Sequence, residues 1–170
     1  MPLRLPSPTI CQGLCGEQRD RSSRLPQLQA ELPRAASALD IVVGGLRQSF
    51  GLVAPPGARE RVAARAALRR CEAQDLAARP FGSLSYGQAR RVLFARALVR
   101  QPAILLLDEA LTGLDGRTRA ALAALLDGPA LAHTTLIMAS HHRDEWPQRT
   151  SHELELRAGK ARFAGALRRP

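Results

Sequence analysis

Hydrophobic side chains recur at helical intervals in four segments of this chain, residues 35–52, 58–78, 92–98 and 118–126. Apolar residues three or four positions apart form one face of a helix, so we expect an amphipathic helix in each segment. Gly44 and Gly45 are expected to weaken the first helix by about 1 kcal/mol each relative to alanine, and Pro80 to stop the second. In the second helix, the positions expected to face inward are Val62, Ala66, Leu68 and Leu76.

Two shorter segments, residues 104–107 and 134–139, are predominantly apolar without helical spacing. Such runs suit strands that are buried on both faces of a parallel sheet. A helix between two adjacent strands implies a parallel crossover, so the expected fold class is α/β rather than a helical bundle. Residues 152–156 and 161–163 flank Gly159 and predict a closing hairpin.

Polar residues follow both predicted strands. Asp108 and Glu109 come directly after the first strand, and His141 follows the second. Ligands of open α/β sheets collect at the carboxyl ends of strands, so the carboxylate pair could hold a metal ion and polarise a water molecule. Residues 85–87 form a small turn before a helix, where free backbone N–H groups and the helix dipole favour an anion. Taken singly, these residues also suit solvated strand ends and an ordinary N-cap serine.

The order of these segments carries more information than any one of them. LSYGQ is followed by ILLLDE, then by a TGLD turn, and then by an apolar strand that ends near His141. In order and spacing, this set is similar to the ATP-binding subunits of ABC transporters. The resemblance implies a P-loop NTPase-like parallel sheet with a helical subdomain, with ATP and Mg²⁺ as cofactors. Residues 83–99 and 140–156 look most like the molybdate-type, ModF-like members of the family.

The resemblance also implies roles for single residues. Asp108 would end the Walker B strand and hold Mg²⁺ through water, and Glu109 would be the general base that polarises the attacking water. Asp115 of the D-loop, residues 112–115, would lie at a dimer interface, and His141 would be the switch histidine that reaches the γ-phosphate. The signature motif, which contacts ATP bound to the opposite subunit, would consist of Leu84, Ser85, Tyr86, Gly87 and Gln88.

Four positions connect this chain to the family less directly. Gln27 is the first candidate for the Q-loop glutamine, which touches Mg²⁺ and the transmembrane partner, and Gln29 is the second, although a plain polar loop is as good an interpretation of both. Tyr86 stands where the family usually has glycine, and Ala110 stands where it usually has proline.

The Walker A loop of the family, G-x-x-x-x-G-K-S/T, does not occur in this sequence. Lys160 is the only lysine and follows a glycine, but Leu154 stands at the first glycine position and Ala161 at the hydroxyl position. We therefore expect residues 24–167 to be a partial ABC ATPase domain that is incomplete at its N-terminus. It would comprise a helical subdomain at about residues 35–82 and a catalytic C-terminal half at about residues 83–167. Residues 1–23 are rich in Pro, Ser, Gly and Arg and are expected to be disordered or unrelated.

The formal net charge of +10 makes nucleic acid a partner to consider. We do not expect it, because the arginines are scattered and aromatic residues make up only 4% of the chain. Cys11, Cys15 and Cys71 do not form a disulfide framework or a metal-binding set, and are read as reduced thiols. No apolar run approaches the length of a membrane span, so we expect a cytoplasmic protein that reaches the membrane surface through a partner.

Three hypotheses from different classes remain open. The chain is an ATP-binding subunit of an ABC transporter that lacks its Walker A loop, and therefore inactive on its own. Alternatively, it is a non-hydrolysing partner that supplies the signature motif in trans, or a basic nucleic-acid-binding module. The expected partners under the first two hypotheses are a second ABC ATPase subunit, as a homodimer or heterodimer, and transmembrane permease subunits.

Overall fold

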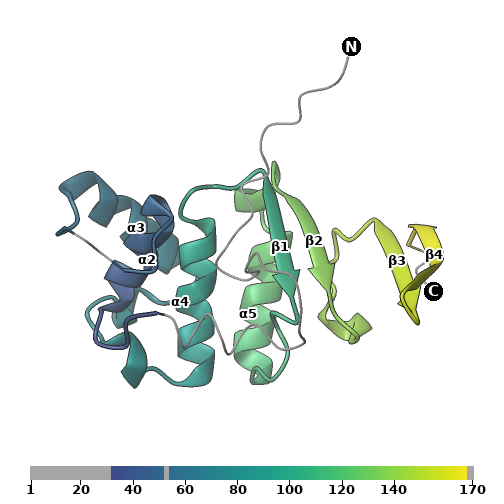
Figure 1. Ribbon diagram of the computed structural model, residues 1–170, viewed down its shortest axis with the longest axis horizontal. Helices are drawn as coiled ribbons and strands as arrows, with labels where there is room; N and C mark the ends of the chain where they lie inside the picture. Colours follow the sequence, from purple (N-terminus) through teal and green to yellow (C-terminus); the bar gives the residue numbers. More distant parts are fainter. Residues whose placement is uncertain (1–31, 52–53, 168–170) are drawn as a thin grey trace, which may run out of the picture.

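The computed structural model describes residues 32–51 and 54–167, so Gln27, Gln29, Cys11 and Cys15 lie outside the described residues. Its helices are α2 (Ala38–Arg47), α3 (Ala58–Arg70), α4 (Tyr86–Leu98) and α5 (Gly116–Asp127). Its strands are β1 (Ile104–Asp108), β2 (Thr135–Ala139), β3 (His152–Arg157) and β4 (Lys160–Ala166) (Figure 1). Short 3₁₀ turns are η1 (Gln74–Leu76), η2 (Phe81–Ser83), η3 (Pro129–Leu131) and η4 (Arg143–Glu145).

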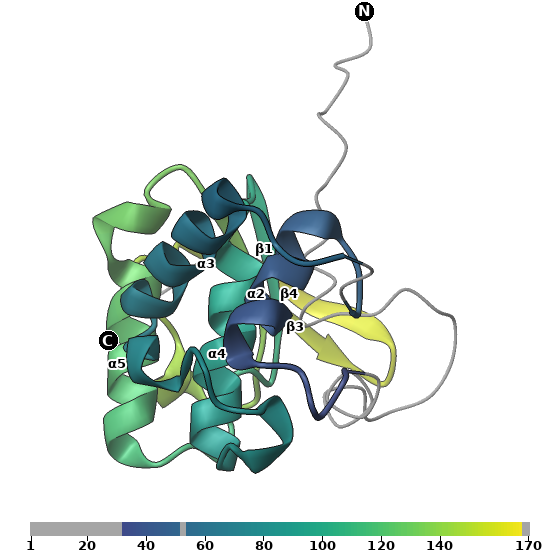
Figure 2. The same ribbon diagram turned by 90° about the vertical axis from the view of Figure 1, so that its left-hand side faces the viewer.

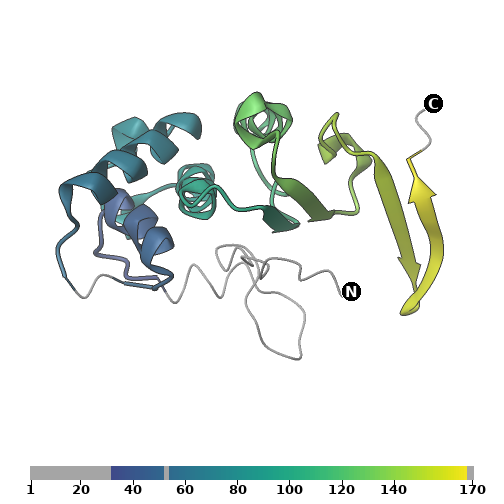
Figure 3. The same ribbon diagram turned by 90° about the horizontal axis from the view of Figure 1, so that it is seen from above.

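The strands β1 and β2 are parallel neighbours, paired from Ile104 with Thr135 to Asp108 with Ala139. The connection between them contains α5, as the sequence predicts, and the α/β fold class is confirmed. Seen from above, α4 and α5 lie on the same face of this sheet (Figure 3). The carboxyl ends of both strands therefore meet at one edge of the sheet, beyond which the polar residues follow.

The two strands are less buried than their apolar sequences predict. Leu105 and Leu107 are buried in the same core as the helices, whereas Ile104 and Leu106 on the opposite face are only half-buried. In β2 the expectation of a buried strand is wrong, because Ile137 is 55% exposed. The physical reason is that helices of the described part of the chain cover one sheet face only, while alternate strand residues point to the other.

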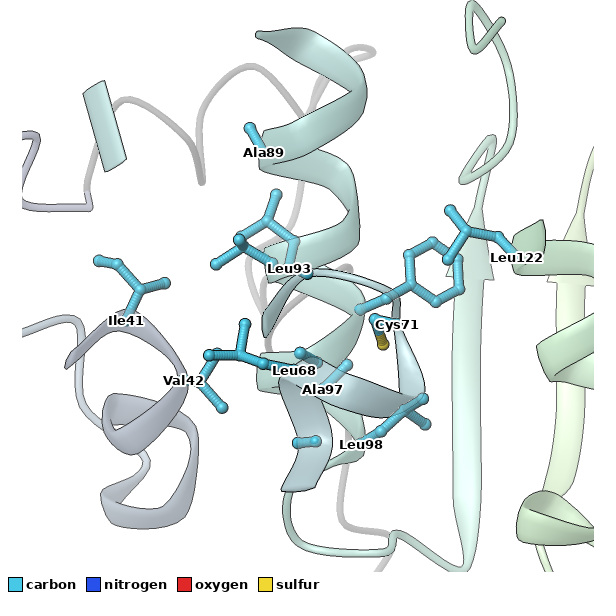
Figure 4. Close-up of a cluster of buried hydrophobic side chains, with 14 of the residues drawn as sticks. Ile41, Val42, Leu68, Cys71, Ala89, Leu93, Ala97, Leu98 and Leu122 are labelled. Carbon is cyan, nitrogen blue, oxygen red and sulfur yellow. The ribbon is translucent and has the colours of Figure 1, made fainter. Parts of the chain in front are cut away.

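The helices α2, α3 and α4 pack around a shared apolar core. Figure 2 shows the three helices from the side of α2 and α3. Ile41 and Val42 of α2 meet Leu68 of α3 and Leu93 of α4 in this core (Figure 4). Phe94, which is fully buried, and Leu122 of α5 belong to the same cluster. One continuous core thus joins the helical part of the chain to the face of the sheet.

The second helix is shorter than predicted and turns a different face inward. It ends at Arg70 rather than near Pro80, because Glu72 takes a left-handed conformation with φ 51°. Its inward stripe is Ala64, Ala67 and Leu68, which places Val62 on the opposite side, 67% exposed. The prediction that Val62 faces inward is therefore wrong, while Leu76 is buried within η1.

Gly44 and Gly45 allow α2 to approach α4 closely. A Cβ atom at Gly44 would lie 2.6 Å from Nη1 of Arg96, and one at Gly45 would lie 2.4 Å from the carbonyl oxygen of Arg96. The Arg96 guanidinium is buried and donates to the carbonyl oxygens of Ile41 at 2.7 Å and Ser49 at 2.8 Å. These glycines, which lower helix propensity, are thus required by the packing of α4 against α2.

The antiparallel pair β3 and β4 forms the predicted hairpin at the far end of the molecule from α3 (Figure 1). Cys71 is a buried free thiol, and burial raises its pKa to about 12, which agrees with the interpretation of a reduced, unreactive cysteine. None of the helices in the described residues is long and apolar enough to span a membrane.

Candidate functional site

Glu109 lies at the carboxyl end of β1 in a conformation that non-glycine residues rarely adopt. Its φ of 46° is left-handed, and its N–H donates to the carbonyl oxygen of Ala139 at 2.9 Å, which fixes it to the end of β2. The Glu109 Oε1 atom lies 2.7 Å from Nδ1 of His141, and its Oε2 atom accepts a hydrogen bond of 2.6 Å from the Thr112 hydroxyl. Backbone strain of this kind concentrates at functional sites, where the surrounding structure holds it in place.

Both partners of Glu109 stabilise its ionised form. The Thr112 hydroxyl has the largest effect and lowers the pKa of Glu109 below its usual value, and His141 lowers it further, against an opposing effect of partial burial. The Glu109 side chain is 37% exposed and that of His141 is 68% exposed, so water reaches the pair. An ionised, oriented carboxylate that water can approach is the arrangement that a general base requires.

Two further residues of this cluster, Glu145 and Ser140, were not anticipated as site residues from the sequence. Glu145, in η4, is 3% exposed, and its Oε2 atom accepts a hydrogen bond of 2.9 Å from the Ser140 hydroxyl. The Thr112 hydroxyl lies 3.3 Å from the same oxygen. Nothing in the polar segment around Glu145 predicts that this side chain is buried. Its burial results from the contacts of η4 with Ser140 and Thr112 and not from a periodic pattern.

The signature turn begins α4, as predicted. Ser85 is the N-cap: its hydroxyl accepts from the N–H of Gln88, and the Gln88 side chain accepts from the N–H of Ser85 at 3.0 Å. This capping box fixes the turn and leaves the N–H groups of Tyr86 and Gly87 without a partner among the described residues. Leu84, half-buried, packs against the core and anchors the segment. The turn therefore presents free N–H groups and a serine hydroxyl whose hydrogen remains available.

The D-loop connects the signature turn to Glu109 within the same chain. The Tyr86 hydroxyl donates to the carbonyl oxygen of Thr112 at 3.3 Å. A Cβ atom at Gly87 would lie 3.5 Å from Oδ2 of Asp115, so these two residues are close neighbours. Asp115 is the N-cap of α5, and the hydrogen bond from the N–H of Thr118, 2.9 Å, lowers the pKa of Asp115. Glu109 and the signature turn are thus linked through Thr112.

Asp108 ends β1 with its side chain exposed. No group of three or more acidic, histidine or cysteine residues that could hold a metal ion occurs in residues 32–51 and 54–167. This does not exclude Mg²⁺, which commonly takes one or two carboxylates together with water and phosphate oxygens rather than a cage of protein ligands. One accessible carboxylate beside Glu109 fits that donor set, and the free N–H groups of the signature turn fit a phosphate.

Comparison with known proteins identifies the family to which this arrangement belongs. The family model described as "ABC transporter" matches residues 13–112 of the chain, which is more than half of its 170 residues. This chain belongs to the ABC transporter family. Among solved structures, the dimeric structure of the bacterial ABC transporter cassette MJ0796 is similar, with a TM-score of 0.68 and 27% identity, and covers 81% of this chain and 59% of that one.

Curated relatives of this ABC family member are also named as ATP-binding proteins of transporters. The uncharacterized ABC transporter ATP-binding protein YmeB of Lactococcus lactis is 38% identical over 75% of this chain and 50% of its own length. The manganese transport system ATP-binding protein MntB of Listeria monocytogenes is 32% identical over 72% of this chain and 52% of its own length. ModF of Escherichia coli is 43% identical over 45% of this chain and 16% of its own length. The chain spans about half the length of YmeB and MntB.

Proposed function

We propose that this chain acts as an ATP-binding subunit of an ABC transporter, with its signature turn facing nucleotide held by a second ABC ATPase subunit. The observation that carries the proposal is the cluster at the strand ends, where Glu109 is held between Thr112 and His141. A base at this edge and an anion-binding helix start lie on one chain, and the D-loop links them. The subunits would close head to tail, in a homodimer or a heterodimer.

Each residue of the site has a role in this proposal. Asp108 would hold Mg²⁺ through water, and Glu109 would accept a proton from the attacking water. His141 would contact the terminal phosphate while its Nδ1 keeps Glu109 oriented. The Mg²⁺ ion and ATP supply a neutralised triphosphate whose terminal phosphoryl group is transferred to water. Ser85 and Gly87 would bind the nucleotide of the opposite subunit, and Asp115 would lie near the junction of the two subunits.

Lys160 does not lie where a phosphate-binding lysine would be expected. A phosphate-binding lysine of a Walker A loop lies at the start of a helix, whereas Lys160 begins β4 in the closing hairpin. The second candidate function, a non-hydrolysing subunit that supplies the signature in trans, agrees equally with the signature turn at the start of α4. We further propose permease partners that contact a helical subdomain at about residues 35–82, and hence a place at the cytoplasmic face of a membrane.

The relatives do not share one transported substrate. Comparable relatives are named for manganese transport, in MntB, and for zinc transport, in TroB of Treponema pallidum. No observation favours molybdate, which the likeness to ModF suggested, over either of these. The nucleic-acid hypothesis stands as the alternative outcome: it requires binding that falls steeply as salt rises.

The test combines binding and turnover. The purified 170-residue chain is titrated with Mg-ATP by calorimetry, and is mixed with a complete cassette such as YmeB while phosphate release is measured. We expect the mixture to hydrolyse more ATP than the complete cassette alone, and Ser85→Arg to remove the gain. Ser83→Arg, an equally exposed neighbour, is the matched control and should keep it. A folded chain that neither binds Mg-ATP nor stimulates the cassette would refute the proposal.

A Glu109→Gln variant separates the two candidates. If Glu109 is the base in the mixed assembly, this variant should bind as the unmodified chain does but lose the added turnover. Retention of the full gain would show that Glu109 is not the base and would favour the non-hydrolysing partner.

A further inference from the structure

A single hydroxyl lies between two carboxylates in this chain. Thr112 Oγ1 is 2.6 Å from Oε2 of Glu109 and 3.3 Å from Oε2 of Glu145. A threonine hydroxyl has one hydrogen to donate, so it can satisfy only one of the two acceptors at full strength. A hydroxyl hydrogen bond is usually 2.7 to 2.8 Å long, so the hydrogen belongs to Glu109 in this conformation and Glu145 is the weaker competitor.

Glu145 is an unusual residue to bury at this place. Its side chain is 3% exposed, and burying a carboxylate is unfavourable unless it is paired or well hydrogen-bonded. The charged neighbours on its own turn are engaged elsewhere, Arg143 with Glu153 and Asp144 with Arg119. Within the described residues, the hydrogen bonds to Glu145 come from the hydroxyls of Ser140 and Thr112. An apolar residue would fill this position more favourably if packing were its only role.

Thr112 lies where a movement of the signature turn would reach it. Its carbonyl oxygen accepts from the Tyr86 hydroxyl. The following residue, Gly113, has a φ of +75°, and a Cβ atom there would lie 3.6 Å from Cε1 of Tyr86. Because glycine adopts this conformation without strain, the backbone can rotate here more easily than at neighbouring positions. A shift of the first turn of α4 therefore moves Thr112 relative to Glu109.

We propose that Glu145 is a positioning residue that competes with Glu109 for the Thr112 hydroxyl, so that a shift of the D-loop transfers this hydrogen bond and frees Glu109 to receive water. The inference rests on the proposed function, since it assigns the Glu109 carboxylate a reacting water. In the observed conformation each oxygen of Glu109 already has one hydrogen-bond partner, Oε1 with His141 and Oε2 with Thr112, and transfer of the Thr112 hydroxyl would leave both lone pairs of Oε2 open to water. Glu145 provides the second acceptor that makes release of Oε2 possible.

The proposal predicts that Glu145 acts only through Thr112. Glu145→Gln keeps the shape but weakens the acceptor, so the hydroxyl stays on Glu109. In the mixture with a complete cassette, we expect kcat to fall about tenfold, the equivalent of one hydrogen bond, while KM for ATP is unchanged. In a Thr112→Val background the same change should have no further effect, because no hydroxyl remains to be shared. Asp144→Asn, an adjacent exposed acid, is the matched control and should leave turnover unchanged.

An independent readout is chemical denaturation of the chain alone. It compares the unmodified chain, Thr112→Val, Glu145→Gln and the double variant. We expect the effects of Thr112→Val and Glu145→Gln to be non-additive by about three- to tenfold in the unfolding equilibrium constant, as for residues in direct contact. Additive effects in denaturation, or a fall in kcat for Glu145→Gln that persists in the Thr112→Val background, would overturn the inference. A folded unmodified chain that neither binds Mg-ATP nor adds hydrolysis in the mixture would instead refute the proposed function, a result distinct from additivity.

Discussion

Replacing Gly45 with alanine tests the close packing of α2 against α4. A Cβ atom there would lie 2.4 Å from the carbonyl oxygen of Arg96, 3.0 Å from its Cγ, and 3.1 Å from a methyl carbon of Val99. Ordinary van der Waals contact begins at 3.4 Å, so the Arg96 backbone would have to retreat by about 1 Å. Because the Arg96 guanidinium also donates to Ile41 of α2 and to Ser49 just after it, that retreat strains two hydrogen bonds.

Two effects of opposite sign determine the result of this substitution. Alanine in a helix interior is favoured over glycine by about 1 kcal/mol. Overpacking a well-filled core costs about 1–3 kcal/mol, and weakening the two hydrogen bonds of Arg96 adds about 1 kcal/mol each. Packing therefore outweighs propensity, and Gly45→Ala should reduce the free energy of unfolding by about 2–4 kcal/mol.

The assay is urea denaturation of the whole chain followed by far-ultraviolet circular dichroism. The matched control is Gly116→Ala at the first position of α5, where the added methyl group would have no heavy atom within 4 Å. The control should change stability by no more than about 0.5 kcal/mol. If Gly45→Ala were as stable as the unmodified chain, or more stable, the contact between α2 and α4 described above would be refuted.

Three further changes test other parts of the fold. Arg96→Leu removes the guanidinium hydrogen bonds to Ile41 and Ser49, so urea denaturation should show a loss of about 2–4 kcal/mol; an unchanged midpoint would contradict its structural role. Leu105→Ala in β1 should lose about 2–5 kcal/mol in the same assay, and a smaller loss would mean that the helix-covered sheet face is not tightly packed. The Arg47 guanidinium lowers the pKa of Glu60 from 4.5 to about 2. The ionised Glu60 side chain therefore stabilises the folded chain above pH 4.5, and this stabilisation is lost as the pH falls towards 2. The melting temperatures of the unmodified chain and of Glu60→Gln should differ at pH 6 and converge near pH 2. A constant difference would contradict this.

Local patterns were sufficient to predict much of the fold. The apolar run before Asp108, the helix after Asp115 and the hairpin around Gly159 were all predicted with the correct type of element. Each depends on residues that are neighbours in the sequence: a strand pattern, an N-cap, or a turn glycine. The type of each element, and the parallel pairing of β1 with β2, follow from this information alone.

Burial was predicted less well, because it depends on which layer covers each face. Ile137 has the sequence of a core residue, but its face of the sheet is not covered by the helices of the described residues. Arg96 has the sequence of a surface residue, but its long side chain reaches carbonyl groups about fifty residues away in the chain, with separations of 55 and 47 residues. Contacts of such range are set by tertiary packing, which overrides local preference.

In the candidate site, too, the residues within a local motif were predicted and those placed by long-range contacts were not. Glu109, His141 and Ser85 were identified from their place in a motif order, and the structure places Glu109 and His141 in contact. Thr112 was recognised only as the start of the D-loop, and Glu145 was not recognised at all. Both owe their positions to hydrogen bonds between segments that are remote in sequence, since Thr112 and Glu145 are 33 positions apart. No spacing rule within a single segment contains that information.

The left-handed backbone at Glu109 sets stability against activity at one position. At a φ of 46°, glycine or asparagine would relieve strain of about 1 kcal/mol or more. A library of variants sorted only for resistance to heat should therefore enrich Glu109→Gly and Glu109→Asn, whereas sorting for turnover should remove both. Position 109 would then be among the few sites at which an unconstrained search for a sturdier protein erases the chemistry, so retention of glutamate there is a sign of selection on function rather than on folding.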